Sequence, residues 1–156
     1  MRRPSVIDPD KGAAVAALLI RIVVGPIMAY HGYRKYDGSI YHFVETVKEL
    51  GLPFPILVAH AVAVIELVGG ICLLLGLSTR LWAGLLALQM AGIVFVVKPE
   101  AGLIGAPGKG TGFELELLIE VCALALVLLG PGLLALDHRF GLEREAGSRP
   151  ETRVGT

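Results

Sequence analysis

Hydrophobic residues in this chain gather into four continuous blocks and do not alternate with polar ones. The blocks run from about residue 13 to 31, 55 to 77, 81 to 97 and 113 to 134. A bilayer core about 30 Å thick needs about 20 residues of helix, within a range of about 17–25. A spanning strand would instead alternate over about 10 residues. The pattern therefore predicts an all-α integral membrane bundle of four transmembrane helices.

The segment between the first two blocks has a different pattern. In residues 39–51 charged side chains occupy one side, and the apolar side chains recur at helical spacing on the other: Ile40, Phe43, Val44, Val47 and Leu50. The segment is too short to cross a bilayer. We expect a short helix lying in the membrane interface, with an ordinary helix in an extramembrane loop as the alternative.

The connections define one domain over residues 13–138, with cytoplasmic tails at residues 1–12 and 139–156. Only Ser78, Thr79 and Arg80 join the second and third blocks, so these helices must form a tight antiparallel hairpin. The stretch GAPGKGTG in the following loop lacks the Walker spacing G-x-x-x-x-G-K-[ST]. We therefore expect no nucleotide site there.

Basic residues indicate how the bundle is oriented. With both tails inside, eight Lys and Arg residues lie on the cytoplasmic side and five on the outer side. The inner set is Arg2, Arg3, Lys11, Arg80, Arg139, Arg144, Arg149 and Arg153, and the outer set is Arg34, Lys35, Lys48, Lys98 and Lys109. The positive-inside rule then predicts a multi-pass membrane protein with both termini in the cytoplasm.

Composition agrees with the membrane class and excludes several others. The 156 residues are 54% hydrophobic and 18% charged, whereas soluble domains have about 45–50% and about 25%. A formal net charge of zero and the lack of a basic run argue against nucleic acid as a partner. Two cysteines are too few for a disulfide scaffold. No H-x-x-x-H or C-x-x-C spacing occurs, so no metal is expected.

Two opposite charges lie near the middle of the first two blocks. Arg21 and Glu66 would each cost about 3 kcal/mol if left alone at the bilayer centre. A direct Arg21–Glu66 pair would satisfy both charges. The alternative is that the Arg21 side chain extends to the inner interface, with its head group in water.

The fourth block adds acids to this group. Glu116 and Glu120 are four residues apart and share one helix face. We therefore expect a buried polar cluster of Arg21, Glu66, Glu116 and Glu120. Its excess of acids over bases indicates that some carboxyls are protonated or that the bundle contains a wet cavity.

Polar residues also mark the two ends of the blocks. The Gly25-Pro26 pair should bend the first helix, since proline lacks a backbone donor. The bend would leave a pocket with His31 and Lys35 at its outer mouth. Alternatively, His31 belongs to an aromatic and basic belt at the lipid head groups. Thr79 and Arg80 mark the surface at the hairpin.

Four segments in order resemble the DoxX family of small bacterial membrane proteins, over about residues 15–138. They are LLIRIVVGPIMAYHGYRK, GLPFP, IELVGGICLLLGLSTR and GFELELLIEVCALALVLLGPGLLALD. The sequence departs from the family at residues 133–135, where such proteins often read R-x-S after the GPG.

The resemblance implies a four-helix bundle in the bacterial inner membrane, tied to redox biology. It favours a membrane component of an oxidoreductase or redox-defence system, with a quinone or other small molecule as candidate ligand and a soluble redox enzyme as candidate partner. The other partners are membrane lipid and a second copy of the chain. Alternative functions are a non-catalytic membrane anchor or assembly partner, and a small-solute or proton pathway. The sequence shows no cofactor motif of its own.

Overall fold

The computed structural model describes residues 8–105 and 111–142. Within these ranges the chain is helical and contains no strand, which confirms the all-α class. Most of the two tails and residues 106–110 of the glycine-rich loop lie outside the described part of the chain.

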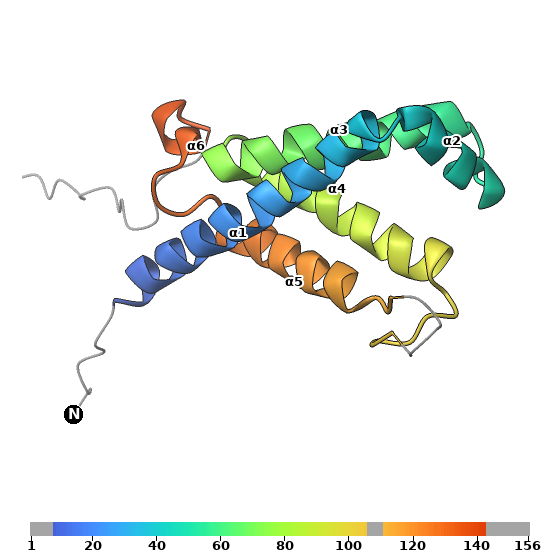
Figure 1. Ribbon diagram of the computed structural model, residues 1–156. Helices are drawn as coiled ribbons and strands as arrows, with labels where there is room; N and C mark the ends of the chain where they lie inside the picture. Colours follow the sequence, from blue (N-terminus) through green and yellow to red (C-terminus); the bar gives the residue numbers. More distant parts are fainter. Residues whose placement is uncertain (1–7, 106–110, 143–156) are drawn as a thin grey trace, which may run out of the picture.

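The helices follow one another with short connections (Figure 1). A π-helical segment, labelled η1, directly continues the fourth helix, and the last helix is a single turn. The elements are α1 (Pro9–Asp37), α2 (Ile40–Glu49), α3 (Pro55–Leu75), α4 (Thr79–Gly92), η1 (Ile93–Val97), α5 (Glu114–Leu129) and α6 (Leu136–Arg139).

Three of the described helices are long and apolar enough to cross a membrane: α1, α3, and α4 together with η1. The last block forms a shorter helix than its hydrophobicity suggests, because α5 has 16 residues. Its end is set by Gly130-Pro131-Gly132, where both glycines have positive φ, a conformation that breaks a helix. The expected fourth span therefore stays a prediction.

The helices form two antiparallel pairs, α1 with α3 and α4 with α5 (Figure 1). At one end, here called the α6 end, the α3–α4 connection meets the turn after α5 and α6. At the other end, called the α2 end, the two pairs point apart in Figure 1. A cavity lined by residues of both pairs lies toward this end.

Glycines bring α1 and α3 into direct backbone contact. A methyl group on Gly25 would stand 2.9 Å from the Gly70 carbonyl oxygen, and one on Gly32 would stand 2.7 Å from the Ala63 carbonyl oxygen. Small residues at helix interfaces are the usual means of close packing in membranes. These contacts set the antiparallel register in which Gly25 lies opposite Gly70 and Gly32 opposite Ala63.

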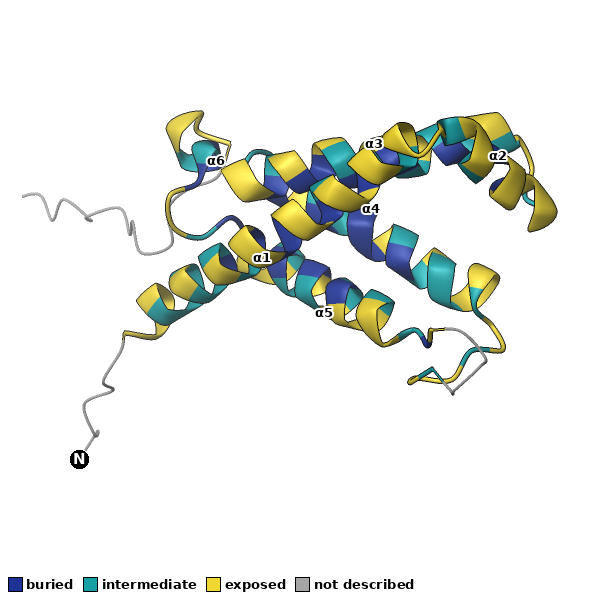
Figure 2. Ribbon diagram, viewed as in Figure 1, coloured by how far each residue is buried: buried dark blue, intermediate teal, exposed yellow. Residues whose placement is uncertain are grey.

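The outer surfaces of the helices are strongly apolar. Figure 2 shows exposed residues along the outside of the helices and buried residues where they meet. Exposed side chains include Leu19, Val23, Leu88, Phe95 and Leu128. A soluble monomer rarely exposes large contiguous apolar patches, so this surface fits a lipid environment.

The short amphipathic helix expected at residues 39–51 is present as α2. Val44 and Val47 are buried against Ala59 of α3, and Phe43 packs at the edge of this cluster. The apolar face of α2 therefore packs on the protein. Its position in the membrane interface stays a prediction.

Candidate functional site

The carboxylate of Glu66 lies near the middle of α3 and is almost completely buried, with 3% of the residue exposed. Its Oε2 forms an ion pair with Nζ of Lys35, in the last turn of α1. Its Oε1 accepts a hydrogen bond of 2.7 Å from Nε2 of Gln89 in α4. Lys35 also stands over the ring of Phe43, with its Nζ 5.0 Å from the ring centroid. Both oxygens of the buried acid are therefore paired.

The expected Arg21–Glu66 pair was wrong, and the helix register explains why. The contact of Gly25 with Gly70 places Arg21 opposite Leu74, eight residues from Glu66 and so about 12 Å away by helical rise. Helix side chains also tilt toward the N-terminus of their helix. This tilt directs Arg21 away from Glu66, whereas it directs Lys35 toward Glu66.

Arg21 instead binds backbone carbonyls at the α6 end. Its guanidinium donates to the oxygens of Leu73 (2.8 Å) and Leu74 (3.1 Å) in the last turn of α3. It also donates to Pro131 (2.6 Å) and Leu133 (3.0 Å) in the turn after α5. Only 1% of Arg21 is exposed. The side chain thus joins α1, α3 and this turn, and we interpret it as a structural clamp.

Asp137 completes the polar contacts of the α6 end. Its carboxylate accepts hydrogen bonds from the backbone N–H groups of Ser78 (2.5 Å) and Thr79 (3.0 Å), at the start of α4. A carboxylate there is favourable because the first N–H groups of a helix lack partners. The sequence pattern alone indicates no role for Asp137. The available signal was a single acid after the apolar run LLAL.

The structure also places the two hairpin residues. Thr79 lies at the hairpin as expected and is fully buried, with its backbone N–H donating to Asp137. Its position at the membrane surface stays a prediction. Arg80 is exposed, and its Nη1 donates a 2.7 Å hydrogen bond to the Val127 carbonyl oxygen of α5. The hairpin is therefore tied to both α5 and the segment after it.

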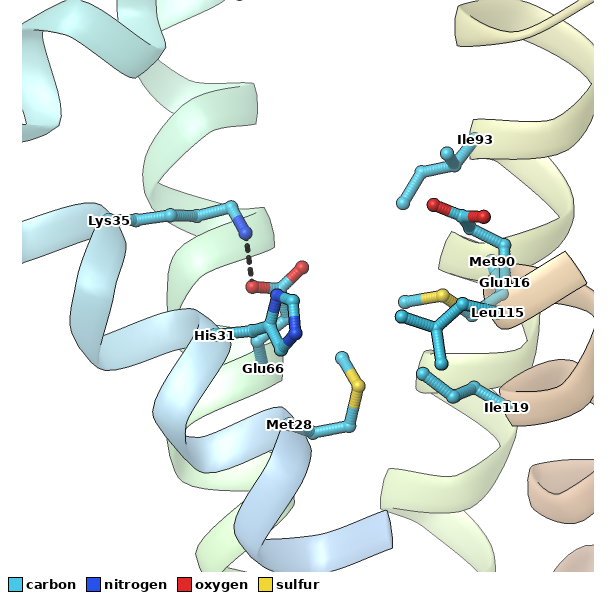
Figure 3. A pocket seen from close by; sticks show the side chains of 9 residues that line it. All are labelled: Met28, His31, Lys35, Glu66, Met90, Ile93, Leu115, Glu116 and Ile119. Atoms are coloured by element: carbon cyan, nitrogen blue, oxygen red, sulfur yellow. Dashed lines mark hydrogen bonds and ion pairs between the residues drawn. The ribbon is translucent and has the colours of Figure 1, made fainter. Parts of the chain in front are cut away.

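A cavity of about 160 Å³ lies between the two helix pairs toward the α2 end. Figure 3 shows that His31, Lys35, Glu66 and Met28 form one wall, and that the other lining residues face them across the gap. The second wall belongs to α4, η1 and α5. The lining consists of Met28, His31, Lys35, Glu66, Met90, Ile93, Leu115, Glu116 and Ile119.

A second ion pair stands in the far wall of this cavity. Nζ of Lys98, which follows η1, lies 2.8 Å from Oε1 of Glu116 in the first turn of α5. The same ammonium donates to the carbonyl oxygen of Gly112 (2.8 Å) and to Oγ1 of Thr111 (3.3 Å). Lys98 lies in the loop between η1 and α5, as expected from the sequence, and its pairing with Glu116 could not be predicted because it depends on how the start of α5 packs beside η1.

The predicted polar cluster is thus divided between the two ends of the bundle. Glu66 and Glu116 line one cavity together with His31 and Lys35, and His31 is exposed at the rim. Arg21 lies at the α6 end. Glu120 is half-buried one turn beyond Glu116 and is not part of the cavity lining. The binding role of these residues stays a prediction.

Gln89 and the two methionines of the cavity were not anticipated. Gln89 is a single amide within an apolar span, and that isolated polar residue was the available signal. The two methionines provide no such signal in the sequence, because methionine is also an ordinary core residue.

Known proteins are similar to this chain over most of its length. A sequence model of the DoxX family matches residues 16–99. A Bacillus subtilis protein, CatD, whose name describes a candidate oxidoreductase, is 32% identical over 128 residues, covering 82% of this chain and 89% of the relative. The inner membrane protein YphA of Escherichia coli is 32% identical over 137 residues, covering 83% and 95%.

A more distant relative is a membrane protein of Mycobacterium tuberculosis, 28% identical over 132 residues. The alignment covers 80% of this chain and 81% of that protein. No solved structure matches the chain significantly. The relatives therefore agree with the membrane character of the helices.

Proposed function

Since this chain belongs to the DoxX family of membrane proteins, we propose that it is the membrane component of an oxidoreductase or redox-defence system. We further propose that the cavity between the two helix pairs binds a quinone-type head group and that a soluble redox enzyme is the partner. The cavity lined by His31, Lys35, Glu66 and Glu116 carries this proposal. The name of the Bacillus subtilis relative supports the redox class.

The lining has the chemistry that a quinone site needs. His31 and Lys35 are groups that can donate to a ring oxygen, and Glu66 and Glu116 are groups that can exchange protons. Met28 and Met90 supply polarizable sulfur, which makes favourable contacts with aromatic rings. A few polar groups in an otherwise apolar pocket are typical of small-molecule sites.

The size of the cavity suits one six-membered ring. A dry cavity of about 150 Å³ in another protein holds benzene, and this cavity measures about 160 Å³. The long tail of a membrane quinone would have to leave the cavity at its rim, beside the exposed His31. The ligand we expect is therefore a membrane quinone whose ring alone enters the cavity.

We propose that α5 is the fourth membrane crossing. It starts beside Lys98, at the end of α4 and η1, and its last turn meets Arg80, at the start of α4. Because α4 with η1 is long and apolar enough to cross a membrane between these two points, α5 would return across the same distance. Four crossings would leave both termini on one side, and the count of basic residues supports the cytoplasm as that side. The Escherichia coli relative supports the inner membrane as location.

Ligand binding to the purified full-length protein tests the proposal. A ubiquinone analogue with a short tail is titrated into protein in mild detergent, with empty micelles as blank. We expect saturable binding, weakened about tenfold by His31→Ala, which is the effect of about one hydrogen bond.

His60→Ala is the matched control for His31→Ala. Nδ1 of His60 lies 2.8 Å from the Ile56 carbonyl oxygen, and its ring packs against Tyr36 outside the cavity. Binding should therefore be unchanged in this variant. No saturable binding above empty micelles, or equal loss in both variants, would contradict the proposal.

The pair of acids in the cavity favours a proton pathway as the second candidate function, because intramembrane carboxyls commonly mark such pathways. Proteoliposomes with a pH-sensitive dye distinguish the two candidates. Proton flux that is lost in Glu66→Gln, without quinone binding, would select the pathway.

A further inference from the structure

Each of the two cations that border the cavity is paired with an acid. Lys35 pairs with Glu66, and Lys98 pairs with Glu116. An ammonium has three donors, and Nζ of Lys98 has three acceptors, on Glu116, Gly112 and Thr111. The two ammonium groups and the two carboxylates at the cavity borders therefore form two ion pairs. A charged ligand would disturb this balance of charge, whereas a neutral ligand would not.

One acceptor, by contrast, remains unused in the cavity lining. Oε2 of Glu116 is buried and has no hydrogen-bond partner among the described residues. Leaving buried acceptors without donors is costly, so a ligand that brings donors gains more here than one that brings only acceptors.

We infer, on the basis of the proposed function, that the cavity binds the reduced, hydroxyl-bearing form of its ring ligand in preference to the oxidised form. A quinone has only carbonyl acceptors and would meet a further acceptor at Oε2 of Glu116. A quinol is also neutral, and one of its O–H groups can donate to this oxygen. The ring itself is the same in both forms, so the apolar contacts of Met28 and Met90 do not discriminate.

Equilibrium dialysis without oxygen tests this preference. The probes are the tail-free ubiquinone head group, its quinol, and the dimethyl ether of the quinol, which keeps the oxygens but cannot donate. Empty micelles of the same detergent correct for partition. We expect the full-length protein to bind the quinol at least about tenfold more tightly than either other probe, which is the effect of about one hydrogen bond.

Matched variants on α5 locate the acceptor. Glu116→Gln supplies an amide donor of its own, so the preference for quinol over quinone should fall below about twofold, because one acceptor site is replaced by a donor. Glu120→Gln makes the same change one turn away, outside the cavity lining, and should keep the full preference. The comparison of quinol with its ether uses the wild-type chain alone, so it holds even if a variant does not fold.

The outcomes separate this inference from the proposed function. Similar affinity for all three probes, or tighter binding of the quinone, would leave the quinone site standing and overturn the preference. Binding of none of the probes would overturn the proposed function and the inference with it. A preference that survives Glu116→Gln would remove Glu116 as the acceptor and contradict the inference as stated.

Discussion

Glu66 of α3 pairs with Lys35, fourteen residues beyond Arg21 along α1. Both cations lie on the same helix, and the glycine contacts between α1 and α3 place neither directly opposite the acid. Lys35 reaches it because its side chain tilts toward the N-terminus of α1. The cation that pairs with the buried acid therefore lies toward the α2 end. Arg21 instead contacts backbone carbonyl oxygens at the α6 end.

The Lys35–Glu66 pair should be energetically coupled. Removing one member of a buried pair costs roughly 3–5 kcal/mol, and we expect the lower part of this range because Lys35 is 18% exposed. Lys35→Met or Glu66→Met alone should lower the free energy of unfolding, and the double variant should recover part of the loss. Thermal unfolding in detergent measures all three.

The same set of variants for Arg21 and Glu66, namely Arg21→Met, Glu66→Met and the double variant, is the control for this double-mutant cycle. Since Arg21 and Glu66 do not contact each other, their losses should add to within about 0.5 kcal/mol. Additive losses for Lys35 and Glu66, together with coupling between Arg21 and Glu66, would contradict the pairing.

Arg21→Lys should destabilise the protein although it preserves the charge. The planar guanidinium donates to four carbonyl oxygens in two segments, whereas a lysine ammonium has three donors and a different geometry. Losing two of these bonds should cost roughly 2 kcal/mol or more. The melting temperature measures the effect, with the exposed Arg139→Lys as control. A melting temperature equal to that of the control would show that the clamp does not need an arginine.

Gly70→Ala should separate α1 from α3. A methyl group at Gly70 would meet the Gly25 carbonyl oxygen at 2.6 Å, so the backbones must move apart. Since Lys35 reaches Glu66 across this contact, both folded yield and quinone binding should fall. Gly92→Ala is the matched control, because nothing lies within 4 Å of its added methyl group. Equal yields of the two variants would argue against the close approach.

Single cysteines should report the topology. The native Cys72 and Cys122, both free thiols, are first changed to alanine. An impermeant thiol reagent on intact cells should then label Gly105→Cys and spare Ser5→Cys and Ser148→Cys, because the proposed four crossings put both termini on one side and the count of basic residues favours the cytoplasm. Opposite labelling of Ser5→Cys and Ser148→Cys would mean three crossings. Labelling of both tails, with Gly105→Cys spared, would invert the orientation.

The class of the fold followed from the sequence. The bilayer sets the length of an apolar helix, so the blocks around α1, α3 and α4 were readable without any knowledge of packing. The helical spacing from Ile40 to Leu50 likewise predicted α2. The family resemblance rested on local motifs, and the matching family model confirms it.

The pairing of charges was decided by the tertiary structure. The similar depth of Arg21 and Glu66 in the membrane suggested that they form an ion pair. Which cation pairs with Glu66 depends, however, on the register of two helices and on the direction of their side chains. The register comes from Gly25 and Gly32 packing against α3, and no linear pattern shows which glycines meet. For the same reason the sequence placed acids in the bundle, while only packing showed that Glu116 lines the cavity with Glu66 and that Glu120 does not.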